Sequence, residues 1–260
     1  MTTAIHNIVR RIRRRLVARR LPRNPFPVPA EQYRDTVFVV GDSHVSLFSG
    51  LEIIQPIWPS PGLDILPALR TFHLGPVLAY SLDRYGSASL GREKLEAVLT
   101  FLPPRARMLL SFGEIDCRAH LLKGKPSQKE LSARLDSCHA NFMQSATRLN
   151  RAGFRVSIYN VVPSTPSESW SDAQYPVHGT CRERNEVTRR LNGMLKASCE
   201  TKAIGFLCTF EHFVDAEGRT DPKWFMDPVH LNQRALPLSL EAGREIFSTT
   251  QPTPNATIQG

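Results

Sequence analysis

The sequence predicts an α/β fold, in which a parallel sheet is covered by helices on both faces. Short apolar runs rich in β-branched residues recur along the chain, and each suits a strand buried on both faces. Stretches with the apolar spacing of a helix lie between these runs and after the last one. Such alternation is typical of a parallel sheet with helical crossovers.

Four segments fit the buried-strand pattern: Thr36–Val40, Met108–Phe112, Val156–Val162 and Ile204–Phe210. Three longer segments fit the helical pattern: Lys129–Ala152, Arg182–Cys199 and Leu231–Phe247. A chain of 260 residues suits one large domain that buries roughly 70–75% of its unfolded surface. We expect this domain to span residues 31–248, after an N-terminal segment of residues 1–30 and before a loose tail of residues 249–260.

The positive charge of the chain is concentrated at its N-terminus. The net charge is +9, yet eight arginines fall within the first 23 residues and the first acidic residue is Glu31. Without these eight, 25 basic residues (33 − 8) face 24 acidic ones. Since the body is nearly neutral and no aromatic residue is interleaved with the arginines, we expect no nucleic-acid partner.

The N-terminal segment has the pattern of a basic amphipathic helix. Within residues 4–20, five aliphatic side chains recur at helical spacing: Ile5, Ile8, Val9, Ile12 and Leu16. Such a helix can lie on an anionic membrane surface, with its arginines on phosphates. A solvated leader fits the same residues equally well. The four prolines of Leu21–Ala30 make the following stretch a spacer.

The cysteines favour a reducing, cytoplasm-like compartment. They number five, an odd count, and are scattered along a chain too large to need disulfides. The Arg-rich N-terminus lacks the apolar core and cleavage site of a secretory leader, and no stretch approaches the ~20 apolar residues of a membrane span. Cys117 and His120 have metal-like spacing, but no second pair completes the ligands, so we expect no metal.

Polar residues follow the predicted strands where active sites of α/β sheets lie. Ser43 comes directly after the first strand within Gly41-Asp42-Ser43-His44, and Asp227 and His230 lie three apart before the last helix. A serine becomes a nucleophile when a base removes its proton and a carboxylate orients that base. Each motif alone also fits a turn or a helix cap, but their combination predicts a Ser-His-Asp site.

These motifs resemble the SGNH hydrolase superfamily, also called GDSL-like esterases and lipases. The resemblance implies a three-layer α/β/α, flavodoxin-like fold with about five parallel strands and no metal or organic cofactor. It makes Ser43 the nucleophile and, through its N–H, an oxyanion donor, with Asp227 and His230 as its partners. Gly75 matches the second donor of the family.

The third block of the family, Gly-x-Asn-Asp, is altered. Aligned on Gly113 and Asp116, its oxyanion Asn falls on Ile115, which has no donor. Three explanations stay open: Arg118 or another donor replaces the amide, two backbone N–H groups suffice, or hydrolysis has been lost. One lost donor can cost about 3–4 kcal/mol of transition-state stabilisation.

The polar residues near these blocks have two interpretations. Asp42, Glu114 and Arg118 are candidates to support the substrate or the oxyanion. For Glu114 and Asp116 we favour an internal ion-pair cluster, and for Arg118 the site. His44 either lines the pocket or is structural.

The resemblance implies a carboxyl-ester hydrolase or acyl transferase. The substrate it suggests is a short acyl ester, such as an acetyl group on a carbohydrate. The alternative, favoured by Ile115, is an inactive module that binds a glycan or a partner.

Overall fold

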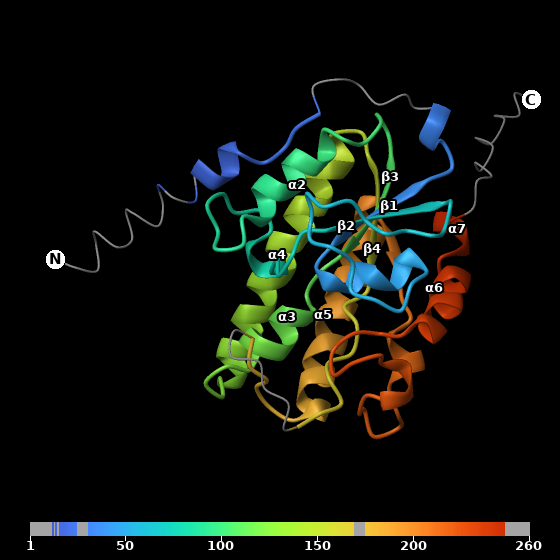
Figure 1. Ribbon diagram of the computed structural model, residues 1–260. Helices are drawn as coiled ribbons and strands as arrows, with labels where there is room; N and C mark the ends of the chain where they lie inside the picture. Colours follow the sequence, from blue (N-terminus) through green and yellow to red (C-terminus); the bar gives the residue numbers. More distant parts are fainter. Residues whose placement is uncertain (1–11, 13, 15, 25–30, 169–174, 248–260) are drawn as a thin grey trace, which may run out of the picture.

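The computed structural model describes residues 12, 14, 16–24, 31–168 and 175–247 (Figure 1). Much of the expected N-terminal segment and all of the expected tail of residues 249–260 therefore lie outside the described residues. Five parallel strands form one sheet in the order β2-β1-β3-β4-β5. Their bounds are β1 Val37–Gly41, β2 Leu69–His73, β3 Arg107–Ser111, β4 Arg155–Tyr159 and β5 Gly205–Leu207. The predicted α/β fold is confirmed, and this strand order is that of the flavodoxin-like sheets.

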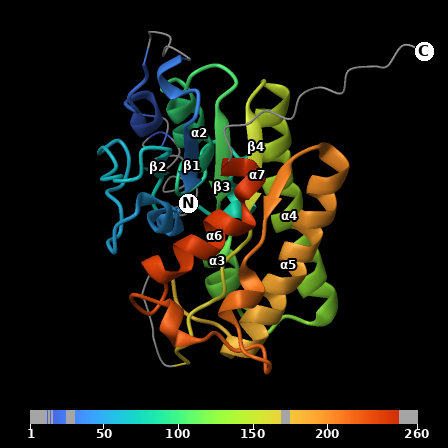
Figure 2. The ribbon, with the colours of Figure 1, turned by 90° about the vertical axis from the view of Figure 1, so that its right-hand side faces the viewer.

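The sheet lies between two layers, each packed on its own core. Because side chains alternate along a strand, Phe38 and Val40 enter one core, whereas Val37 and Val39 enter the other. The first layer contains α2 (Gly91–Leu99), α4 (Gln128–Arg151) and α5 (Cys181–Lys202), and the second contains η2 (Ser43–Ser49), α6 (Leu236–Ala242) and α7 (Arg244–Phe247). Figure 2 shows α4 and α5 running alongside one another.

Short helices complete the described chain. They are η1 Glu31–Tyr33, η3 Ala79–Ser81, α3 Glu114–Asp116, η4 Cys117–Leu121, η5 Phe210–Phe213, η6 Pro222–Trp224 and η7 Gln233–Ala235. Most of them follow a strand or precede α6, so they form the connections at the carboxyl edge of the sheet. Among the described helices, none has the length and apolar content that crossing a bilayer requires.

Two elements differ from the expectation: one predicted helix is divided, and one strand was not predicted. The helix expected over Leu231–Phe247 is divided into η7, α6 and α7, because Pro237 lies at the start of α6 and Gly243 at its end. Strand β2 was not expected, since its residues Leu69–His73 alternate between buried and half-buried positions at the sheet edge. A continuous apolar run marks only strands that are buried on both faces.

Candidate active site

The turn after β1 presents Ser43 at the first position of η2. Asp42 caps this helix, because its Oδ1 accepts a hydrogen bond from the His44 N–H (3.0 Å). The Asp42 N–H donates to the Ser111 carbonyl of β3 (3.1 Å), which fixes the turn to the neighbouring strand. Burial raises the pKa of Asp42 to about 6, against the opposing effect of His44. These contacts make Asp42 a residue that holds the turn in place.

Ser43, His230 and Asp227 form a continuous chain of hydrogen bonds. The Ser43 Oγ lies 2.7 Å from Nε2 of His230, and Nδ1 of the same ring lies 2.7 Å from Asp227 Oδ2. Since an ionised carboxylate only accepts, Nδ1–H donates to Asp227 and Nε2 is left to accept the Ser43 hydroxyl proton. All three residues are half-buried.

The local chain holds Asp227 ionised. Its Oδ1 accepts hydrogen bonds from the backbone N–H groups of Val229 and His230, each at 2.8 Å. Although partial burial opposes ionisation, the hydrogen bond and charge of the His230 ring and these amides lower the pKa of Asp227 to about 2. Burial lowers the pKa of His230, with Asp227 opposing the shift, so the imidazole is neutral and able to accept a proton at neutral pH.

Gly75 lies just past the end of β2, in a segment tied to the nucleophile turn. The Leu74 N–H donates to the Gly41 carbonyl (2.8 Å), and Lys94 Nζ donates to the Leu74 carbonyl (2.6 Å). Gly75 has φ +79°, a left-handed conformation that favours glycine. Its role as an oxyanion donor stays a prediction.

The third block provides no side-chain donor at Ile115. This residue is buried within α3, and its neighbour Asp116 points its carboxylate at the backbone N–H groups of Ala79 (2.8 Å) and Tyr80 (3.1 Å). Burial raises the pKa of Asp116 to about 7. Asp116 therefore fastens α3 to η3 by accepting hydrogen bonds and, within the described residues, forms no ion pair, contrary to the ion-pair interpretation.

A buried cluster of charged side chains lies next to the turn that carries Ser43. Arg118 Nε donates to both carboxylate oxygens of Glu114 (2.8 and 3.1 Å), and Arg118 Nη1 donates to the Tyr175 carbonyl (2.6 Å). The opposite side of Glu114 faces His44, whose Nε2 lies 3.6 Å from Oε2. These contacts favour an ion-pair role for Glu114 and Arg118 over a direct contact of Arg118 with an oxyanion.

The same cluster shifts two further pKa values. Despite burial, His44 and the Arg118 charge lower the pKa of Glu114 to about 2. Burial disfavours the charged form of His44, but Glu114 and Asp42 outweigh it and raise the pKa of His44. The His44 ring packs against that of His230, with centroids 5.1 Å apart. His44 is thus a buried neighbour of the proposed base and does not lie on an exposed rim.

The sequence interpretation missed the contact between His44 and Glu114. The available signal was their position: each comes just after one of two neighbouring strands, β1 and β3, whose carboxyl ends meet at one edge. His73, at the end of β2, is a further buried histidine. Its Nδ1–H donates to the Gln55 carbonyl (2.7 Å), and burial lowers its pKa, with the charges of His230 and Lys94 adding to the effect.

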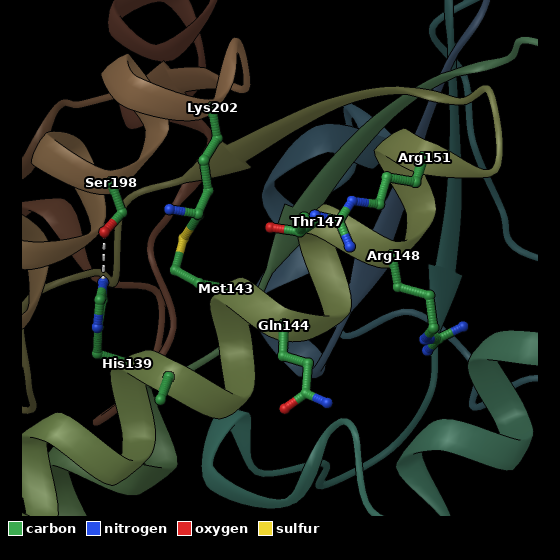
Figure 3. Close-up of a pocket in the computed structure, with 9 residues that line it drawn as sticks. His139, Met143, Gln144, Thr147, Arg148, Arg151, Ser198 and Lys202 are labelled. Carbon is green, nitrogen blue, oxygen red and sulfur yellow. Dashed lines mark hydrogen bonds between the residues drawn. The ribbon is translucent and has the colours of Figure 1, made fainter.

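Among the surface hollows of the described residues, two lie on α4, away from Ser43. One, of about 540 Å³, lies between α4 and α5, where His139 Nε2 and Ser198 Oγ are 2.8 Å apart (Figure 3). Another, of about 510 Å³, lies between η3 and α4 and includes Asp116 in its lining. Within the described residues, no group of three or more His, Cys, Asp or Glu side chains is arranged to hold a metal, and Cys117 is a free, buried thiol.

No protein family matches the sequence, and no curated protein matches it either. Solved structures do. The chain is similar to a Bacteroides fragilis protein whose name assigns it, by inference, to the acylhydrolases (13% identity, 89% of this chain and 92% of that one, TM-score 0.54). It is equally similar to a GDSL-like lipase of Bacteroides thetaiotaomicron (13% identity, 91% and 96%, TM-score 0.54). The chain has the fold of the GDSL-like hydrolases.

The GDSL-like fold alone does not assign an activity. The C-terminal domain of the Drosophila Oskar protein, whose name describes no esterase, is also similar to this chain (11% identity, 80% of this chain and 86% of that one, TM-score 0.50). An activity can therefore be inferred only from the side chains around Ser43, which include His230 and Asp227.

Proposed function

We propose that the protein is a serine-dependent carboxyl-ester hydrolase or acyl transferase. The observation that supports this most strongly is the hydrogen-bond chain from Ser43 Oγ through His230 to Asp227. A hydroxyl whose acceptor is a neutral imidazole, itself oriented by an ionised carboxylate, has the three parts that nucleophilic acyl transfer requires.

In the proposed mechanism Ser43 Oγ attacks the ester carbonyl while its proton passes to His230 Nε2. The N–H groups of Ser43 and Gly75 stabilise the oxyanion. Asp227 stays ionised and stabilises the imidazolium. His230 then returns the proton to the leaving alcohol as the C–O bond breaks. Water, or a second alcohol in acyl transfer, gives its proton to His230 and attacks the acyl-enzyme. His230 then returns this proton to Ser43 Oγ as the bond between the acyl group and Oγ breaks.

The proposed substrate class is a short acyl ester, such as an acetyl ester of a carbohydrate. This part rests on the likeness in fold and motifs to GDSL-like hydrolases and on no particular side chain of this protein. Hydrolysis and transfer share every step up to the acyl-enzyme, so one nucleophile test serves both.

Labelling with a fluorophosphonate probe tests the nucleophile. We expect the folded wild-type protein to be labelled and the Ser43→Ala variant to be unlabelled. Ser137→Ala is a matched control, since Ser137 is a half-buried serine of α4 whose hydroxyl donates to the Ala133 carbonyl. Undiminished labelling of Ser43→Ala would show that another residue reacts.

The alternative function is a binding module without esterase activity, and the observation that favours it is the buried Ile115 in place of a side-chain donor. Folded wild-type protein that is neither labelled nor able to release p-nitrophenol from p-nitrophenyl acetate would favour this alternative.

We also propose a peripheral contact between residues 4–20 and anionic membranes. Of this segment the structure describes Ile12, Arg14 and residues 16–20, among which Ile12, Leu16 and Val17 are about half exposed, at 53%, 52% and 47%. Aliphatic side chains facing solvent beside arginines suit a headgroup boundary. Co-sedimentation with anionic vesicles should fall on deletion of residues 1–20 and on raising the salt concentration.

A further inference from the structure

The exposed apolar surface of the described residues is confined to one part of the chain. Ten large apolar side chains are exposed, and all of them lie between residues 12 and 85: Ile12, Leu16, Val17, Ile53, Ile54, Ile57, Leu63, Ile65, Tyr80 and Tyr85. Single exposed apolar residues are ordinary, but a local concentration of them marks an interaction surface.

Five of the ten belong to residues 51–66, a segment between η2 and β2 that we call the apolar loop. Its exposed members are Ile53, Ile54, Ile57, Leu63 and Ile65, all aliphatic, with exposed fractions between 38% and 61%. No helix or strand covers these side chains within the described residues.

The apolar loop is folded around a polar centre, Gln55. This residue is 2% exposed. Its N–H donates to Ser46 Oγ (2.9 Å), its carbonyl accepts from His73 Nδ1 (2.7 Å), and its side-chain Oε1 accepts from the Leu63 N–H (2.6 Å). These hydrogen bonds hold the backbone of the loop in place around Gln55. The five exposed aliphatic side chains lie on its outer, solvent-facing side.

The apolar loop borders the Ser43 site on two sides. Gln233, three residues beyond His230, donates from Nε2 to the Leu51 carbonyl (2.9 Å) and from its N–H to Glu52 Oε2 (2.9 Å). A Cβ placed on Gly75 would lie 3.5 Å from Ile57 Cγ2. The exposed aliphatic surface therefore adjoins both the segment that carries His230, the proposed base, and the segment that carries Gly75, the proposed oxyanion donor.

The apolar loop and the basic N-terminal segment lie on the same side of the molecule. Both occupy the left-hand side of Figure 2, at the β2 edge of the sheet. Trp58 of the loop packs edge-on against Phe101 (6.2 Å), next to Thr100, whose Oγ1 accepts a hydrogen bond from the Asn24 N–H (2.9 Å). The apolar loop and the described residues 16–24 of the N-terminal segment thus lie on one face of the molecule.

We propose that the apolar loop docks onto an anionic lipid bilayer, with its aliphatic side chains in the headgroup boundary and the N-terminal arginines on lipid phosphates. An exposed surface of isoleucine and leucine beside a cluster of arginines matches such a boundary in both hydrophobicity and charge. A protein interface core is instead enriched in aromatic residues, which the exposed members of the loop lack. If the proposed function is right, docking turns Ser43 toward esters carried at the membrane surface.

Binding of the full-length protein to vesicles of phosphatidylcholine and phosphatidylglycerol tests the docking proposal. The variant Ile53→Ser/Leu63→Ser/Ile65→Ser should bind at least roughly tenfold more weakly, because apolar area would no longer leave water. The control Glu186→Ser/Lys196→Ser, a charge-neutral change of two exposed residues of α5, should bind like the wild type. Loop binding should persist at high salt, whereas the arginine contribution should not.

Four outcomes are informative. Wild-type protein that does not bind vesicles, or a loop variant that binds as tightly as the wild type, would overturn the proposal. A wild-type dimer that the loop substitutions make monomeric, without vesicle binding, would assign the surface to a second copy of the chain instead. Ser43→Ala should bind vesicles as tightly as the wild type. Wild-type protein that binds vesicles but is not labelled by the fluorophosphonate probe would overturn the proposed function alone.

Discussion

The region around β1 and β2 differs from the region around β4 and β5 in how its chain is connected. After β1 the chain forms the short helix η2 and the apolar loop, whereas β4 is flanked by α4 and α5, two helices of 24 and 22 residues. Each long helix begins with a complete capping box, at Ser127 and at Thr180. The long helices form a scaffold, and the reactive and exposed groups are left to the short connections.

Substitution of the residue that orients His230 should give the largest effect and should leave the scaffold intact. Asp227→Asn removes the acceptor that fixes the His230 tautomer, so we expect the labelling rate to fall by about 10³–10⁴. The free energy of unfolding of the same variant should fall by only about 1–2 kcal/mol, because the ionised carboxylate accepts hydrogen bonds from two backbone N–H groups but is partly exposed to solvent. A labelling rate within tenfold of wild type would contradict the assignment.

A core substitution in the scaffold should have the reverse effect. Phe142 of α4 is fully buried and packs edge-on against Phe112 (5.9 Å). Phe142→Ala should lower the free energy of unfolding by about 3–5 kcal/mol, as measured by urea denaturation. Protein that remains folded should be labelled at the wild-type rate. A matching loss of labelling in the folded fraction would mean that the two regions are not separable in this way.

Asp116 fastens α3 to η3, and its titration should make the free energy of unfolding depend on pH. Its folded-state pKa of about 7 exceeds the ordinary 3.8, so between these values the folded protein holds a proton that the unfolded chain has lost. This contribution therefore stabilises at low pH and is lost as the pH rises from about 4 to 7. Asp116→Asn should remove a pH-dependent change of about 4 kcal/mol in the free energy of unfolding over that range. An unchanged slope in urea denaturation would contradict this.

The smallest effect should come from a helix cap. Ser127→Ala removes the side-chain acceptor for the Glu130 N–H at the start of α4 and should cost about 1 kcal/mol. Its control is again Ser137→Ala, within the same helix, for which a change of less than about 0.5 kcal/mol is expected. Equal losses of unfolding free energy in the two variants would show that Ser127 stabilises α4 no more than a serine within the helix does.

The sequence predicted the parts of the fold in which one pattern covers a whole element. The apolar runs at β1 and β3 and the periodic stretches at α4 and α5 lie within a few residues of the observed elements. The edge strand β2 was not predicted because only alternate positions are buried. The apolar loop was not predicted because five of its aliphatic side chains are exposed, although Leu66 packs against a core.

The candidate site was predictable from motifs, but its surroundings were not. Ser43, Asp227 and His230 were singled out from short motifs, and the structure brings their side chains into contact. The contact of Glu114 with Arg118 is a local i,i+4 pair and fits the ion-pair interpretation, whereas its contact with His44 depends on how the segments after β1 and β3 meet. The same holds for Asp116, whose hydrogen-bond partners lie 36 and 37 residues earlier.

The cluster of Glu114, His44 and Arg118 has a consequence for how this protein can change in evolution. Its groups are nearly inaccessible to water, so loss of His44 or Arg118 alone would leave a buried carboxylate short of a partner, at a cost of about 3–5 kcal/mol. A drifting lineage would pass through that unstable intermediate unless both partners changed together. Related chains should therefore keep His44 and Glu114 as a pair or replace them as a pair, and an alignment of such chains would reveal the coupling as covariation.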